Sequence, residues 1–120
     1  MDQPRFLDFR VYIQAKALHE QVFVLTSKLP SKYYYLVDQI RRAALSVALN
    51  IAEGSAKDSD KDFNRFIQTS LGSAYEVVAA LDILASLTAT DQSQLIDSYC
   101  QLRNQLGALT KKLKNPPARG

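Results

Sequence analysis

The chain has 120 residues and a formal net charge of +3, so it has the length of one domain and is mildly basic. Hydrophobic residues make up 47% and charged residues 22%, a balance that excludes a largely disordered chain. Only four glycines and four prolines are present, which disfavours turn-rich sandwiches and barrels and favours long helices.

The first predicted helix covers about residues 6–28. Its apolar side consists of Phe6, Phe9, Ile13, Ala17, Leu18, Val22, Val24 and Leu25, at the spacing of an amphipathic helix. It is expected to end before Leu29 and Pro30, because the residue that precedes a proline is pushed out of the α region.

The second predicted helix covers about residues 32–53, with Ser31 as its N-cap. Its apolar ladder, spaced by three and four residues, is Val37, Ile40, Ala44, Val47 and Ile51. Gly54 is expected to follow in the left-handed conformation that commonly ends a helix.

Two further helices are predicted in the second half of the chain. Ser59 and Asp62 resemble a capping box, so the third helix is expected to start there. Its ladder is Phe63, Ile67, Ser70, Ala74, Val77, Leu81 and Leu84. Thr90 or Asp91 is expected to cap the fourth helix, which two prolines end after Asn115. Its ladder is Leu95, Tyr99, Leu102, Leu106, Leu109 and Leu113.

Four long helices with short connections and heptad-like apolar seams predict an all-α fold. The expected architecture is an antiparallel up-down four-helix bundle. It is expected to occupy residues 1–115, followed by a short C-terminal tail at residues 116–120. No segment has the alternating pattern of a β-strand.

The second and third predicted helices also carry polar ladders. The first of these is Gln39, Arg42, Ser46, Asn50 and Glu53, and the second is Asp62, Arg65, Thr69, Ser73 and Glu76. Lysine, common on exposed faces, is absent from residues 33–56, whereas arginine suits partly buried sites because it satisfies several acceptors. We interpret the ladders as interface or network residues, with an ordinary exposed polar face as the alternative.

Four short segments within these helices carry a resemblance. They are residues 39–44 (QIRRAA), 46–47 (SV), 50–54 (NIAEG) and 72–76 (GSAYE). Over roughly residues 6–113 the chain resembles the four-helix-bundle proteins encoded in 23S ribosomal RNA intervening sequences. The resemblance implies a small bundle that assembles into a homopentamer and binds RNA. A more distant relative is the accessory variability protein of diversity-generating retroelements, a basic pentamer that binds a reverse transcriptase and nucleic acid.

Several residues of these segments have expected structural roles. Pairing of the second and third helices across the loop at residues 54–59 is expected to bring Arg42, or failing that Arg41, to Glu76. Asn50 is expected to satisfy polar groups at a helix contact. Gly72 is expected to let another helix approach closely, because glycine within a helix otherwise costs up to about 1 kcal/mol relative to alanine. An incidental surface glycine is the alternative.

The sequence shows no catalytic or metal-binding constellation. A single histidine, His19, and a single cysteine, Cys100, leave few nucleophiles or metal ligands. Asp58, Asp60 and Asp62 alternate, but the glycine and distal glutamate of a calcium loop are missing, so helix capping explains them better. We therefore expect no enzyme activity, no metal and no cofactor.

The longest apolar run, residues 77–81, is much shorter than the roughly 20 residues that cross a bilayer. The first residues include Asp2, where a signal peptide is basic. We therefore expect a cytoplasmic protein that does not enter a membrane.

Basic residues concentrate near both ends of the chain. In an up-down bundle the start of the first helix, the loop before the third and the end of the fourth lie at one end. The residues expected to meet there are Arg5, Arg10, Lys57, Lys61, Lys111, Lys112 and Lys114. Lys28 and Lys32 fall at the opposite end, beside Tyr33, Tyr34 and Tyr35, which are stacking or subunit-interface candidates.

This placement predicts modest, salt-sensitive binding of RNA or DNA. The alternative function is an oligomeric protein adaptor, for instance an accessory protein of a reverse transcriptase. The remaining explanation is that the lysines are ordinary solvent-exposed residues with no binding role. A helix C-terminus favours positive charge, which accounts for lysines at this position.

Overall fold

The computed structural model describes residue 6 and residues 9–115. Its four α-helices are α1 (Arg10–Ser27), α2 (Tyr34–Ser55), α3 (Asp60–Thr88) and α4 (Ser93–Lys114), and a 3-10 turn, η2 (Ser31–Tyr33), precedes α2. Within this part of the chain there is no β-strand, so the prediction of an all-α chain with four helices is confirmed. Arg5 and the predicted tail at residues 116–120 lie outside the described residues.

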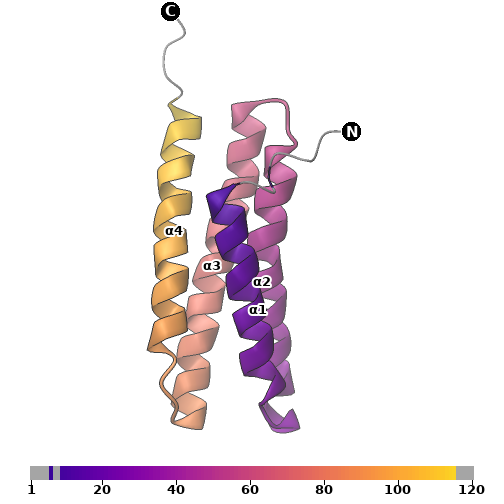
Figure 1. Ribbon diagram of the computed structural model, residues 1–120, viewed down its shortest axis with the longest axis vertical. Helices are drawn as coiled ribbons and strands as arrows, with labels where there is room; N and C mark the ends of the chain where they lie inside the picture. Colours follow the sequence, from indigo (N-terminus) through magenta and orange to yellow (C-terminus); the bar gives the residue numbers. More distant parts are fainter. Residues whose placement is uncertain (1–5, 7–8, 116–120) are drawn as a thin grey trace, which may run out of the picture.

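The four helices stand side by side along the long axis of the molecule (Figure 1). Each packs against two others: α1 and α3 each contact both α2 and α4. The α1–α2 and α3–α4 connections lie at one end, and the α2–α3 loop and the last turn of α4 lie at the other (Figure 1). Every helix can therefore bury one apolar side in a single central core.

The buried ladders of α2 and α3 are the ones the sequence predicts. All five predicted residues of α2 and all seven of α3 are buried. In α4, Leu95, Tyr99, Leu102 and Leu106 are buried, whereas Leu109 and Leu113 near its end are partly buried. Tyr99 is completely enclosed, and burial raises the pKa of its hydroxyl because the charged form is desolvated.

The predicted apolar side of the first helix is partly wrong. Ile13 and Val24 are 53% and 54% exposed, and Ala17 is exposed as well. Of the predicted residues Leu18 and Val22 are buried, and Ala15 and Thr26 are buried with them. A threonine can occupy this buried position because its hydroxyl donates a 2.7 Å hydrogen bond to the carbonyl of Val22 one turn earlier.

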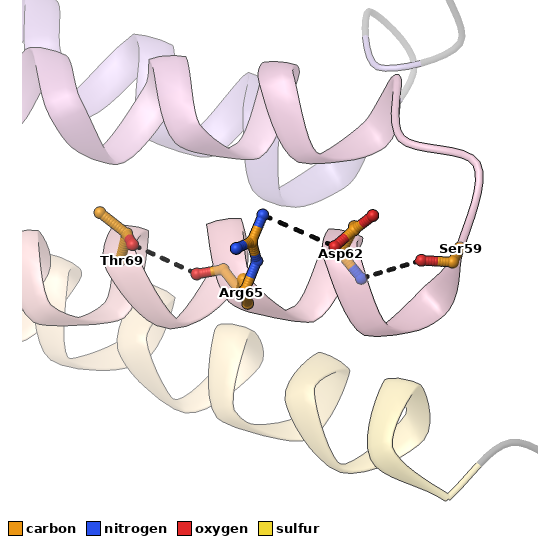
Figure 2. Close-up of polar contacts among 4 residues, drawn as sticks. All are labelled: Ser59, Asp62, Arg65 and Thr69. Carbon is orange, nitrogen blue, oxygen red and sulfur yellow. Dashed lines mark hydrogen bonds and ion pairs between the residues drawn. The ribbon is translucent and has the colours of Figure 1, made fainter.

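Side-chain oxygens accept backbone N–H hydrogen bonds at the starts of α3 and α4. The Ser59 hydroxyl accepts a 3.1 Å hydrogen bond from the backbone N–H of Asp62, as predicted (Figure 2). Before α4, the Asp91 carboxylate accepts one of 2.9 Å from the backbone N–H of Ser93. Hydrogen bonds from the side chain and the backbone of Ser93 lower the pKa of the Asp91 carboxyl. The N-cap residue of α4 is nevertheless Gln92, without a side-chain cap hydrogen bond, so neither Thr90 nor Asp91 is the N-cap, and Asp91 binds the first turn from the position before it.

Gly54 does not have the predicted left-handed conformation. The helix continues through it to Ser55, and no glycine among the described residues has a positive φ. A Cβ at Gly54 would lie 2.8 Å from Cβ of Phe66 and 2.9 Å from Cδ1 of Phe63. Glycine is needed here for close contact between α2 and α3. The left-handed helix end is found at Ala89 after α3, with φ 53°.

Helix α3 is the one helix in the described residues that is long and apolar enough, by length and composition, to cross a membrane. In the bundle its buried ladder faces the core between α2 and α4. Its first turns also carry the charged residues Asp60, Asp62 and Arg65. Only 28% of its most apolar stretch is buried, so core contacts account for part of this apolar content, and the helix also carries exposed apolar side chains such as Ile83 and Leu87.

Candidate nucleic-acid interface

Three lysines occupy the last turn of α4. Lys111, Lys112 and Lys114 are all exposed, and a rigid helix holds them at the end of the bundle. The partial negative charge of the helix C-terminus favours cations at this position, so the fold itself stabilises the cluster. The described residues of this turn contain no acidic side chain.

Arg10, the first residue of α1, lies close to the end of α4. It lines a cleft of about 240 Å³ together with Leu109 of α4 and Phe63 of α3. The ring of Phe9 stacks on that of Phe63 with 6.3 Å between centroids, which fixes the start of α1 over the start of α3. The start of α1 and the start of α3 therefore lie together, next to Leu109 of α4.

The α2–α3 loop adds Lys57 and Lys61 at this end, and both are exposed. Their charges are interleaved with those of Asp58 and Asp60, and Nζ of Lys57 lies 4.9 Å from the centre of the Phe66 ring. Figure 2 shows this loop on the same side of the molecule as the end of α4. The lysines of α4 and Arg10 are therefore the less compensated cations.

We call this region the basic end. Its described members are Arg10, Lys57, Lys61, Lys111, Lys112 and Lys114. The opposite end, at the α1–α2 and α3–α4 connections, carries Lys28 and Lys32, as predicted. The Nζ of Lys32 lies over the Tyr33 ring, 5.3 Å from its centre.

The predicted ion pair between Glu76 and Arg42 or Arg41 is not present. Arg42 instead binds Asp38 on its own helix at 3.0 Å. Arg41 donates from Nε to the hydroxyl of Thr26 at 2.8 Å and also lies over the Phe23 ring of α1. Both arginines find acceptors within one turn or on α1, so neither reaches toward α3. Glu76 remains exposed.

The two polar ladders meet at a single point between α2 and α3. The hydroxyls of Ser46 and Ser73 lie 2.8 Å apart, and Nδ2 of Asn50 donates to the Ser46 carbonyl at 2.9 Å. Nearby, the buried Ser70 hydroxyl donates to the Val47 carbonyl at 2.7 Å. The serines therefore form the cross-helix network, and Asn50 supports it from its own helix.

The remaining ladder residues face outward. Gln39, Glu53 and Glu76 are exposed, and Arg65 pairs with Asp62 of the same helix at 3.5 Å (Figure 2). Thr69 donates its hydroxyl to the carbonyl of Arg65 (Figure 2). Most of both ladders is thus available surface.

Gly72 has open space where its side chain would be. It is exposed, and a Cβ built on it would meet no atom within 4 Å. The expected close approach of a second helix is therefore absent within one subunit. The fold of one subunit does not require glycine at this position.

Large apolar side chains are exposed at the end opposite the lysines. Tyr34 and Tyr35 at the start of α2 are 70% and 63% exposed, and Ile83 and Leu87 near the end of α3 are each 50% exposed. We call this region, with Tyr33, the tyrosine end. The two ends of the bundle therefore present different chemistry.

An aromatic–arginine pair on α3 and α4 was not predicted. The Arg103 guanidinium lies 4.6 Å from the centre of the Tyr75 ring and donates a hydrogen bond to the Tyr75 hydroxyl. Both residues lie about four helical turns from Ala89 in the α3–α4 connection. Counting turns outward from that connection places the two residues at the same level of the bundle.

Among the described residues, no group of three or more histidine, cysteine, aspartate or glutamate side chains is arranged to hold a metal ion. His19 and Cys100 are both half-buried and lie on different helices. Of the three aspartates near the α2–α3 loop, Asp62 forms an ion pair with Arg65 of its own helix.

The sequence model of one protein family, described as 23S rRNA-intervening sequence protein, matches residues 7–115. The match covers all four helices, both polar ladders and the lysines of α4. No curated protein sequence matches the chain.

Proposed function

The chain belongs to the 23S rRNA-intervening sequence protein family, and from that premise we propose that it is an oligomeric, cytoplasmic RNA-binding protein without enzymatic activity. The observation that carries the proposal is the basic end, where Lys111, Lys112 and Lys114 project from the last turn of α4 and Arg10 lines a cleft with Leu109 of the same helix. Cations that lack acidic partners release counterions from a phosphate backbone when they bind it.

One subunit offers few phosphate contacts, so assembly is part of the proposal. We propose that the helices form an antiparallel up-down bundle and that five copies form a homopentamer. Exposed apolar side chains at the tyrosine end and the open backbone at Gly72 support contacts between copies. Repetition of the basic end then multiplies weak contacts by avidity.

The alternative is an oligomeric adaptor whose partner is another protein, such as a reverse transcriptase. The observation that favours this alternative is the exposure of Tyr34 and Tyr35, since tyrosine is enriched in protein–protein interfaces. A protein partner at the tyrosine end leaves the lysines of α4 without a role in binding. RNA affinity therefore separates the two functions.

The test is a gel shift of structured RNA at increasing salt. Wild-type protein is expected to shift the RNA at low salt and to lose affinity steeply as salt rises, because each phosphate contact releases counterions. Replacing Lys111, Lys112 and Lys114 together by Glu is expected to abolish the shift. If wild-type protein gives no shift even at low salt, RNA binding is rejected and the adaptor function takes its place.

A further inference from the structure

A cleft runs between α3 and α4 on the outside of the bundle. Its volume is about 320 Å³, within the usual range for small-ligand sites. The residues that line it are Leu71, Arg103, Asn104, Gly107, Ala108 and Lys111. The α3 side of the cleft is therefore apolar, at Leu71, and the α4 side carries the cations Arg103 and Lys111 and the amide of Asn104.

Arg103 is held in place without being neutralised. Its guanidinium stacks on Tyr75 at 4.6 Å and donates to the Tyr75 hydroxyl and, at 3.3 Å, to Oδ1 of Asn104. No carboxylate among the described residues forms an ion pair with it. A fixed guanidinium with its charge uncompensated binds a phosphate without first having to be ordered.

Gly107 keeps the backbone of α4 accessible in the middle of this cleft. A Cβ at Gly107 would meet no atom within 4 Å, so the packing of the subunit does not explain the glycine. Inside a helix it costs up to about 1 kcal/mol relative to alanine. Close approach of a ligand to the helix backbone is a physical compensation for that cost.

The cleft is continuous with the basic end through Lys111, which belongs to both. Along α4, Lys111 lies eight residues beyond Arg103, about 12 Å along the helix axis. A strand held at the basic end can thus extend along α4 and reach Arg103 with a second phosphate.

We propose that the α3–α4 cleft takes one unpaired nucleotide of the bound RNA. Its base stacks on the Arg103 guanidinium, which the Tyr75 ring backs, its phosphate binds the edge of that guanidinium, and its backbone passes over Gly107. Unpaired bases stack on aromatic rings and on guanidinium planes, whereas the bases of a duplex are already stacked on one another. This inference rests on the proposed RNA binding and adds a preference for single strands.

The test compares a single-stranded oligouridine with an RNA duplex of the same length. In the wild-type protein both probes bind the basic end, and only the oligouridine also fills the cleft. Tyr75→Ala is expected to weaken oligouridine binding about fivefold or more and to leave duplex binding unchanged. Leu49→Ala is the control, because Leu49 is 50% exposed, as Tyr75 is 53% exposed, but lies on α2, away from both the cleft and the tyrosine end. It is expected to change neither affinity.

Gly107→Ala gives a second, independent readout. It is expected to raise the melting temperature, since alanine is the better helix former, and to weaken oligouridine binding while sparing the duplex. The subsite is overturned, while RNA binding stands, if a variant loses affinity equally for both probes. It is also overturned if either Tyr75→Ala or Gly107→Ala binds oligouridine as tightly as the wild type does. If wild-type protein binds neither probe at low salt, RNA binding itself fails and the subsite fails with it.

Discussion

At the basic end, α4 finishes in Lys111, Lys112 and Lys114, while at the tyrosine end α2 begins with Tyr34 and Tyr35. The same four helices build both ends, yet one end is charged and the other is rich in exposed apolar side chains. Lysines of like charge repel a second copy of themselves, whereas apolar side chains gain free energy when a second surface covers them. The contrast favours the proposed phosphate binding at one end and the proposed contact between subunits at the other.

The backbone differs between the ends as well. At the basic end Gly54 stays in a helical conformation because α3 lies directly against it. At the tyrosine end Ala89 takes the left-handed conformation that glycine usually supplies. Packing therefore requires glycine at Gly54, whereas Ala89 takes a strained conformation on the exposed surface.

The largest effect is expected at the tyrosine end. Replacing Ile83 and Leu87 together by Lys should dissociate the assembly, because each buried side chain of this size contributes about 1.5–3 kcal/mol and the new charges would be buried. Light scattering after size exclusion should then report the mass of one subunit, 13.4 kDa, instead of several times that mass.

Leu45 and Leu49 are the matched control, since they are 44% and 50% exposed and lie farther along α2, toward the basic end. Replacing both by Lys should leave the mass unchanged. A wild-type monomer at micromolar concentration rejects assembly, and equal dissociation by both pairs shows that the subunit contact is not confined to the tyrosine end.

The next effect concerns the core of the basic end. Gly54→Ala should lower the free energy of unfolding by about 1–3 kcal/mol, because the new methyl group would lie 2.8 Å from Cβ of Phe66. Gly72→Ala should raise it by up to about 1 kcal/mol, because that position is open and alanine is the better helix former. Urea denaturation measures both, and losses of similar size in the two variants contradict the distinction between them.

The smallest effect is expected at Ala89. A left-handed conformation costs a residue other than glycine about 1–2 kcal/mol, and the greater freedom of glycine in the unfolded chain offsets about 0.4–1 kcal/mol of this. Ala89→Gly should therefore raise the free energy of unfolding by about 0.5–1 kcal/mol. A lower melting temperature in this variant shows that Ala89 is not strained.

The apolar spacing of the sequence is sufficient to predict the core of α2 and α3, where a polar face lies opposite each ladder. In α1 the apolar spacing does not predict the core, because apolar residues lie on all sides of the helix. The spacing therefore does not show that the face with Leu18 is buried and the face with Ile13 is exposed. The burial of Thr26 depends on a hydrogen bond within its own helix, which composition does not reveal.

Four helices joined by short connections must alternate in direction, which places the basic segments at one end. The sequence is therefore sufficient to predict which segments share an end. The partner of an individual side chain is harder to predict. Arg42 forms its ion pair with Asp38, one turn away on the same helix. The spacing of residues in the sequence does not show that Arg42 prefers Asp38 to Glu76 on the neighbouring helix. Counting turns from the α3–α4 connection places Tyr75 and Arg103 at the same level of the bundle, but it does not select Tyr75 over the adjacent Glu76.

The most direct test of the division between the ends is a matched charge reversal. One variant replaces Lys111 and Lys114 by Glu at the basic end, and the other replaces Lys28 and Lys32 by Glu at the tyrosine end. The two variants have the same net charge, so a difference in RNA affinity at fixed low salt reports position alone. We expect the first to lose at least about tenfold in affinity and the second to bind as the wild type does. Equal losses in both variants would contradict a localised binding surface.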